Sequence, residues 1–153
     1  MVSGPIPIEV QVGTMRGRWP TFDLFSQGRD SAVWRGSLKP ILREYEIEIS
    51  YRVPSVLEMP TLRQQPRVKV LSPPLKPRRN DPEGILPHVY NDGTAYPPLC
   101  LFDMEAREWT PWMLLAEKTV PWSIDWLVCY EGWRATGVWS GGGRHAGEKE
   151  VRR

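Results

Sequence analysis

Apolar and polar residues alternate most regularly between residues 44 and 51. Tyrosine or isoleucine stands at every second position, and glutamate or serine stands at the positions between, in the order Glu44-Tyr45-Glu46-Ile47-Glu48-Ile49-Ser50-Tyr51. Successive side chains of a β-strand point to opposite faces of a sheet. The pattern therefore predicts a half-buried strand with the tyrosines and isoleucines on its buried face.

Two other segments also have the character of strands. Residues 32–38 form a short run that is closed by Pro40, and residues 67–71 form another that ends at Pro73-Pro74. Consecutive strands with short connections are typical of an antiparallel meander. The 16 prolines and 13 glycines likewise favour many turns and short elements over a helical bundle.

Helical periodicity is expected at both ends of this meander. Residues 6–19 fit a strand through an alternation from Ile6 to Val12, and fit a helix face through Ile8, Val12, Met15 and Trp19; we favour the helix. Residues 121–133 predict an amphipathic helix with Asp125 and Glu131 directed away from its apolar stripe. That stripe should pack on the sheet, and it consists of Trp122, Trp126, Cys129, Tyr130 and Trp133.

Composition and charge narrow the class of protein. The chain of 153 residues is 41% hydrophobic and 25% charged, which predicts one folded domain over residues 1–145 and a flexible tail over residues 146–153. A net charge of +2 without a concentrated basic stripe does not indicate direct nucleic-acid binding. No apolar run is long enough for a membrane span, and no signal-peptide pattern opens the chain. We expect a cytoplasmic protein with free thiols and no cofactor.

The two cysteines have different surroundings. Cys129 lies within the aromatic stripe, so it should be buried and inert. Cys100 lies in the long irregular segment of residues 72–108, and such segments within a compact domain are usually functional. A reactive thiol needs partial exposure and nearby donors or positive charge. A cysteine between Leu99 and Leu101 fits that role or a purely structural one.

Polar residues near Cys100 suggest supporting roles. His88 precedes it by twelve positions and either tunes the thiol and orients the loop or simply satisfies backbone groups in a turn. Asn91 opens an Asn-Asp-Gly turn signal, and its amide is a candidate donor for an oxyanion. His145 follows three glycines and either folds back towards this region or belongs to the tail.

Several stretches in this order resemble the ubiquitin-conjugating enzymes. The stretches are Trp34-Arg35-Gly36, Tyr45 to Tyr51, Pro66 to Val70, Leu86 to Tyr90, Leu99-Cys100-Leu101 and Glu108-Trp109-Thr110-Pro111. A closer resemblance, to the standalone conjugating-like proteins of bacterial antiphage (CBASS) operons, adds Val120-Pro121-Trp122, Trp126-Leu127, Tyr130-Glu131-Gly132-Trp133 and Thr136-Gly137-Val138-Trp139. It covers roughly residues 30 to 145.

The resemblance implies an α+β fold in which an antiparallel meander carries an N-terminal helix and C-terminal helices. It makes Cys100 the thioester-forming nucleophile, and it makes a cGAS-like nucleotidyltransferase the partner whose C-terminus is captured. His88 matches the histidine that opens the family's His-Pro-Asn turn. Val89 and Tyr90 stand where the proline and asparagine would be, so Asn91 is at best a displaced substitute for the missing amide.

Two other functions stay open on the sequence. One is a noncatalytic binding module on the same fold, for which the altered turn leaves room. The other is a cysteine hydrolase that pairs Cys100 with His88 or His145. Trp109 and Trp112 belong either to the core, which we favour, or to a docking patch for a partner.

Overall fold

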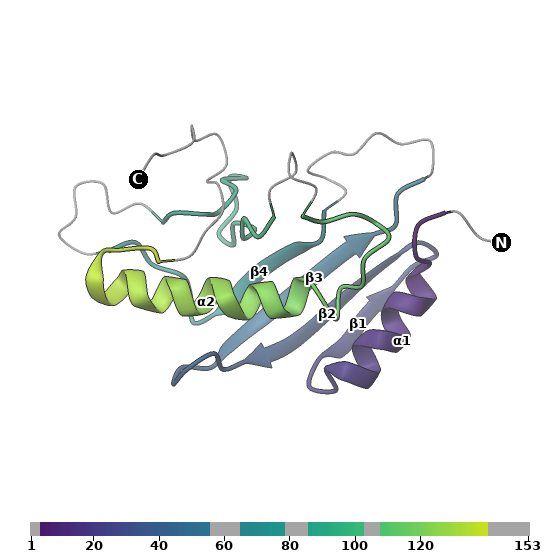
Figure 1. The fold of residues 1–153 in the computed structure, drawn as a ribbon, viewed down its shortest axis with the longest axis horizontal. Coiled ribbons are helices and arrows are strands. Elements are labelled where there is room, and N and C mark those ends of the chain that lie inside the picture. The colour runs from purple at the N-terminus through teal and green to yellow at the C-terminus, as the bar shows by residue number, and fades with distance from the viewer. Residues whose placement is uncertain (1–3, 56–64, 79–85, 103–107, 141–153) are drawn as a thin grey trace.

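The computed structural model describes residues 4–55, 65–78, 86–102 and 108–140. Along the chain come helix α1 (Ile8–Arg18), strands β1 (Asp23–Gln27), β2 (Ser31–Leu38), β3 (Tyr45–Arg52) and β4 (Arg67–Ser72), and helix α2 (Thr119–Thr136). The predicted α+β class is confirmed, and of the C-terminal helices expected, the described part of the chain contains one (Figure 1). The predicted tail of residues 146–153 and His145 lie outside the described residues.

The sheet is an antiparallel meander in the order β1-β2-β3-β4. The three predicted strands are confirmed, and β3 lies between β2 and β4, with Trp34 opposite Ile49 and Ile49 opposite Val68. Strand β1 was not predicted from the sequence. Four of the five residues of this edge strand are exposed, so it lacks the burial that creates an alternating pattern.

One face of the sheet is buried, and both helices cover it (Figure 1). The predicted alternation on β3 is confirmed, since its tyrosines and isoleucines are all at most 3% exposed. The opposite face is polar, and there the Arg35 guanidinium forms an ion pair with Glu48 at 2.9 Å and covers the Phe25 ring at 3.9 Å. The buried-face residues are Ala32, Trp34, Leu38, Tyr45, Ile47, Ile49, Tyr51, Val68 and Val70.

Helix α1 confirms the helical interpretation of the N-terminal segment. It begins after Pro7, whose fixed φ suits the start of a helix. The fully buried Gln11 side chain ties the helix to the segment before α2: its Nε2 donates to the Met113 carbonyl at 2.9 Å, and its Oε1 accepts from the Leu115 N–H at 3.0 Å. Trp19 adds a third link by donating its indole N–H to the Ala116 carbonyl at 2.8 Å.

Helix α2 starts two residues before the predicted position and ends at Gly137, whose φ of 85° suits a residue without Cβ. Trp126, Tyr130 and Trp133 are buried as predicted, whereas Cys129 is half-exposed, so the expectation of a buried Cys129 was wrong. The position predicted for Glu131 was also wrong. Its carboxylate accepts a hydrogen bond from the Tyr45 hydroxyl at 2.8 Å, which draws the side chain towards the sheet.

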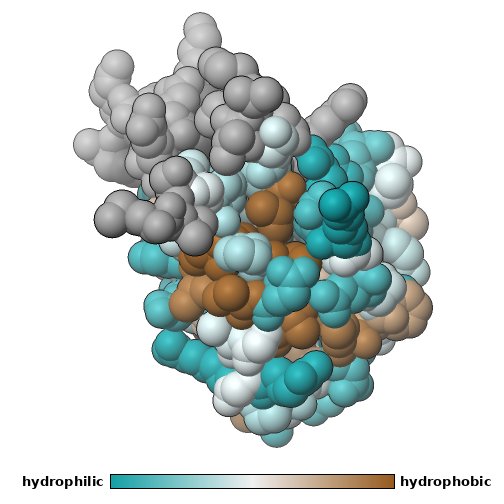
Figure 2. Space-filling view, turned by 90° about the vertical axis from the view of Figure 1, so that its right-hand side faces the viewer, coloured by the Kyte–Doolittle hydropathy of each residue, from teal (hydrophilic) through white to brown (hydrophobic). Residues whose placement is uncertain are grey.

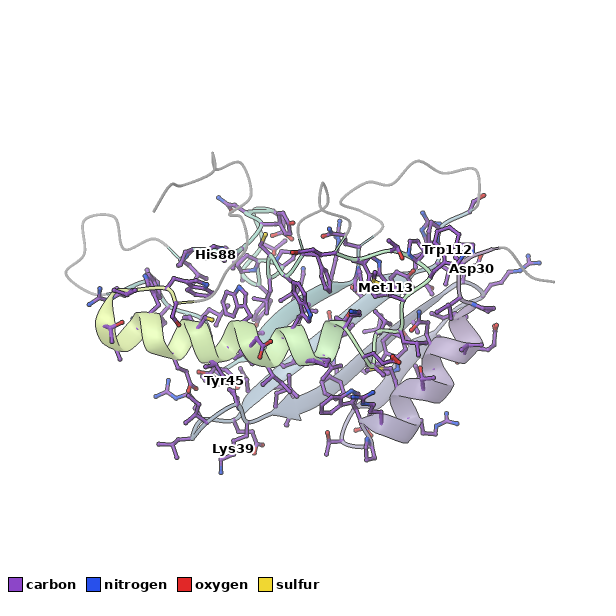
Figure 3. The ribbon with its side chains drawn as sticks, viewed as in Figure 1. Asp30, Lys39, Tyr45, His88, Trp112 and Met113 are labelled. Carbon is purple, nitrogen blue, oxygen red and sulfur yellow. The ribbon has the colours of Figure 1, made fainter. Side chains whose placement is uncertain are left out.

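The prediction that both tryptophans before α2 belong to the core is confirmed for Trp109 and wrong for Trp112. Trp109 is 7% exposed and packs in the core edge-on against Tyr51 and at a tilt against Phe102, whereas Trp112 is 57% exposed. Figure 3 shows Trp112 at the end of the molecule where the N-terminus lies. Figure 2 views this end and shows hydrophobic residues gathered there among polar ones.

Candidate active site

Residues 88–100 form a hairpin-like loop that brings His88 next to Cys100. Val89 and Leu99 form an antiparallel bridge, and on one side of it the Tyr90 N–H donates to the Pro98 carbonyl at 2.8 Å. On the other side, the Cys100 N–H donates to the His88 carbonyl at 2.9 Å. His88 and Cys100, which are twelve positions apart in the sequence, are therefore joined by a backbone hydrogen bond. We call residues 88–100 the cysteine hairpin.

The cysteine hairpin is held between the sheet and α2. The Leu99 N–H donates to the Val68 carbonyl of β4 at 2.8 Å, and the Leu99 side chain is 3% exposed. From the other side, the Trp126 indole N–H donates to the His88 carbonyl at 2.9 Å. Figure 3 places His88 beside the C-terminal half of α2. The cysteine hairpin therefore has a defined backbone position.

His88 has an unusual backbone conformation. Its φ is 55°, which makes it the one non-glycine residue of the described ranges with positive φ. Residues with a Cβ adopt this region at a cost, and they stay there where the surroundings hold them. The imidazole ring packs on Trp139, with ring centroids 4.7 Å apart and planes tilted by 31°.

Cys100 is half-exposed, as a nucleophile requires. Cys129 is half-exposed too, so burial does not distinguish the two thiols. Their positions do: Cys129 lies on regular helix α2, whereas Cys100 lies on the cysteine hairpin, where His88 is its backbone partner.

Asn91 lies at the opposite end of the cysteine hairpin from Cys100. It is exposed and lies beyond the pair formed by Tyr90 and Pro98, three residues along the chain from His88. The structure therefore brings His88, but not Asn91, to the backbone of Cys100.

The turn after Asn91 has its own hydrogen bonds. The Asp92 carboxylate accepts from the Thr94 N–H at 3.0 Å and from the Thr94 hydroxyl at 2.6 Å, which forms an Asx-type turn. These bonds, first that of the hydroxyl, hold the pKa of Asp92 below its usual value, and Lys69, 3.6 Å away, acts in the same direction. The predicted turn at Asn91-Asp92-Gly93 is confirmed, and Gly93 has a φ of 79°.

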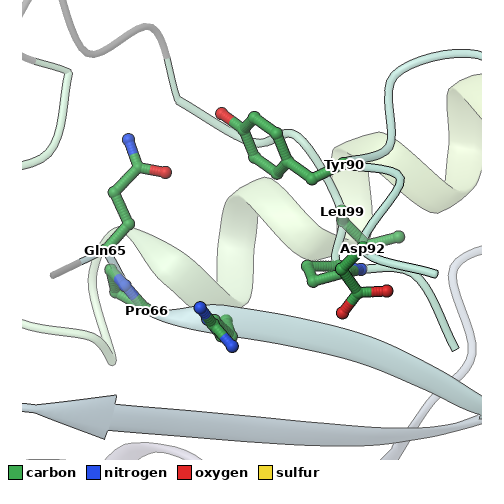
Figure 4. Close-up of a pocket in the computed structure, with 7 residues that line it drawn as sticks. Gln65, Pro66, Tyr90, Asp92 and Leu99 are labelled. Carbon is green, nitrogen blue, oxygen red and sulfur yellow. The ribbon is translucent and has the colours of Figure 1, made fainter. Parts of the chain in front are cut away.

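A small hollow of about 130 Å³ separates the cysteine hairpin from the start of β4. Figure 4 shows Tyr90, Asp92 and Leu99 on one side and Gln65 with Pro66 on the other. Small-molecule sites usually enclose about 300 Å³ or more, so the hollow does not indicate a bound cofactor. Within the described ranges, no three acidic, histidine or cysteine side chains gather as metal ligands would. Nor is any helix there long and apolar enough to cross a membrane.

Sequence reasoning missed the contribution of Trp126 and Trp139. Their rings lie 5.1 Å apart at 66°, and together they contact both the carbonyl and the ring of His88. The aromatic periodicity of α2 identified Trp126 as a core residue. No local pattern pairs an indole N–H with a carbonyl that lies 38 positions away.

An N-terminal helix, a four-stranded antiparallel meander, a cysteine-bearing loop held against the sheet and a C-terminal helix define a ubiquitin-conjugating-enzyme-like protein. The sequence model of one such family, described as Type II CBASS E2 protein, matches residues 11–146. The chain therefore belongs to the type II CBASS E2 family. Among curated proteins, none matches the chain significantly.

Proposed function

We propose that this CBASS E2-like protein forms a thioester through Cys100 with the C-terminus of a cGAS-like nucleotidyltransferase and so primes or regulates that enzyme. Cys100 is the nucleophile and His88 supports it, whereas Asn91, the other supporting residue that the sequence suggested, lies at the opposite end of the cysteine hairpin. The observation that carries the proposal is the hydrogen bond from the Cys100 N–H to the His88 carbonyl. It fixes the backbone of a half-buried cysteine beside the residue that matches the histidine of conjugating enzymes.

The chemistry is acyl transfer. The Cys100 thiolate attacks an activated C-terminal carbonyl, a carbon–sulfur bond forms, and the activating group leaves with the electron pair of the bond that breaks. The described residues contain no glycine-rich phosphate loop, so a separate protein would activate the C-terminus. Loss of the His88 side chain should slow the transfer, and Asn91→Ala should slow it less because Asn91 lies at the other end of the cysteine hairpin.

The test is co-expression with the cyclase encoded beside this protein, followed by non-reducing electrophoresis and intact mass. Wild type, Cys100→Ala and Cys129→Ala are compared, and Cys129→Ala is the matched control because both thiols are half-exposed. A covalent species should disappear in Cys100→Ala, persist in Cys129→Ala and be cleaved by hydroxylamine. An adduct that persists in Cys100→Ala would refute the assignment of the nucleophile.

The second candidate is a noncatalytic module that binds the cyclase. The exposed position of Asn91, at the end of the cysteine hairpin away from Cys100, favours it, because the amide of conjugating enzymes has no counterpart beside the thiol. A stable complex without any adduct, unchanged in Cys100→Ala, would establish this function in place of thioester formation.

A further inference from the structure

The carbonyl oxygen of His88 connects Cys100 to α2. It accepts one hydrogen bond from the Cys100 N–H and another from the Trp126 indole N–H, both at 2.9 Å. A carbonyl oxygen has two lone pairs, so these two donors use its full capacity. The position of the Cys100 backbone therefore depends on an atom that a residue of α2 also holds.

Trp126 is also linked to the His88 ring, through the ring of Trp139. The Trp126 ring packs edge-on against Trp139 at 5.1 Å, and Trp139 packs on the His88 ring at 4.7 Å. Residue 88 is thus held at its carbonyl and at its ring, and its φ of 55° is a conformation that needs such support.

Trp126 is itself held in place. It is 5% exposed and stacks on Tyr130 at 5.5 Å with ring planes only 14° apart. The Tyr130 hydroxyl accepts from the Lys76 N–H at 2.9 Å, which ties this stack to the segment after β4. An indole supported in this way has a fixed direction for its N–H.

We propose that Trp126 is a positioning residue for the thiol of Cys100, acting through the carbonyl and the positive-φ conformation of His88. The inference rests on the proposed function for its catalytic meaning, whereas its structural part concerns the Cys100 backbone alone. Neighbouring amides provide an internal control. The Cys100 N–H bonds to His88, whereas the Leu99 N–H bonds to β4.

The variant Trp126→Phe keeps an aromatic ring and removes the N–H donor. Trp133→Phe is the matched control, since Trp133 lies on the same helix, is 7% exposed and also packs on Tyr130. In amide hydrogen exchange, Trp126→Phe should lower the protection of the Cys100 N–H at least about tenfold, because this N–H donates to the His88 carbonyl. The protection of the Leu99 N–H should stay within about twofold, because that N–H donates to the Val68 carbonyl of β4. Trp133→Phe should leave the ratio of the two protections unchanged.

Reactivity gives a second readout, measured in a Cys129→Ala background. Trp126→Phe should raise the rate of Cys100 alkylation by iodoacetamide about threefold, because a released backbone exposes the thiol more often. The same variant should lower adduct formation with the cyclase about tenfold, because the thiol is less well oriented. A general loss of stability would not raise the alkylation rate and lower the rate of adduct formation at the same time.

Equal protection of Cys100 in wild type and Trp126→Phe, or an equal loss in Trp133→Phe, would overturn the proposal. Should Trp126→Phe not fold, Trp139→Leu takes its place and should lower Cys100 protection about threefold with Leu99 unchanged; no change would again overturn it. A wild type that forms no adduct refutes the proposed function, and the exchange and alkylation measurements still decide the role of Trp126.

Discussion

Tyr45 and Tyr51 lie on the same face of β3 and are 1% and 3% exposed, but within the described residues only one of their hydroxyls has a hydrogen-bond partner. The Tyr45 hydroxyl donates to Glu131 at 2.8 Å. The Tyr51 hydroxyl is buried without a hydrogen-bond partner in the described part of the chain. Replacing each by phenylalanine removes the same atom from two similar environments, so the two variants should change stability in opposite directions.

The magnitudes follow from the hydrogen bonds. Tyr45→Phe loses a bond to a charged acceptor, which contributes about 1.5–3 kcal/mol, and we expect about 1–2 kcal/mol of destabilisation after partial solvation of Glu131. Tyr51→Phe removes a hydroxyl that is hydrated only in the unfolded chain. Its burial without a partner costs about 1–3 kcal/mol, and after allowing for lost packing we expect stabilisation by about 0.5–1.5 kcal/mol.

Urea denaturation at pH 7, followed by tryptophan fluorescence under reducing conditions, measures both free energies of unfolding. The two variants should differ by about 1.5–3.5 kcal/mol, which in a parallel thermal melt corresponds to roughly 3–14 °C between their midpoints, at about 2–4 °C per kcal/mol for a domain of this size. Tyr96→Phe, at an exposed position, is the control and should change the free energy of unfolding by less than about 0.5 kcal/mol. The reasoning is refuted if Tyr51→Phe destabilises the protein as much as Tyr45→Phe does.

Three other predictions concern burial, close packing and pH. Gln11→Leu should cost about 2–4 kcal/mol of unfolding free energy, because it leaves the Met113 carbonyl and the Leu115 N–H without their partner; an unchanged urea midpoint would contradict this. Gly36→Ala should lower the free energy of unfolding by about 1–3 kcal/mol, because the added Cβ would lie 2.8 Å from Phe22 Cα. Gly13→Ala on α1, where no atom lies within 4 Å of the added Cβ, should raise it by about 0.5–1 kcal/mol. Calorimetry of both variants checks the contrast. Burial raises the pKa of Tyr45 and of Tyr51, so the folded state keeps protons that the unfolded state releases above pH 10. The free energy of unfolding should therefore be independent of these groups below pH 10 and fall above it, by up to about 1.4 kcal/mol per pH unit for each tyrosine, and a flat profile to pH 11.5 would refute this.

The strands β2, β3 and β4 were predictable because burial on one face leaves a period of two in the sequence. The edge strand β1 was not, since its exposed residues carry no such period, and its pairing depends on β2 being in place. The helix α2 was predictable from its aromatic spacing. Its contacts were not, because a hydrogen bond such as that from Tyr45 to Glu131 depends on how the helix lies across the sheet.

The candidate site, too, was predictable from the sequence only in part. The order of His88, the turn, Cys100 and the tryptophans identified a family resemblance, and the match over residues 11–146 shows the family. The functional residues Cys100, His88 and Asn91 remain predictions for experiment. Sequence spacing alone did not reveal that His88 lies beside Cys100 while Asn91 lies at the other end of the cysteine hairpin.

By itself, the sequence determined the class of the fold, the buried face of the sheet and the segment that carries the thiol, because hydrophobic period and turn residues act locally. Tertiary structure alone decided which groups meet across the chain. The His88 carbonyl receives donors from the cysteine hairpin and from α2, and Gln11 joins α1 to the segment before α2. The physical reason is that a buried polar group must find a partner, and only the packed arrangement of distant elements determines which partner is within reach.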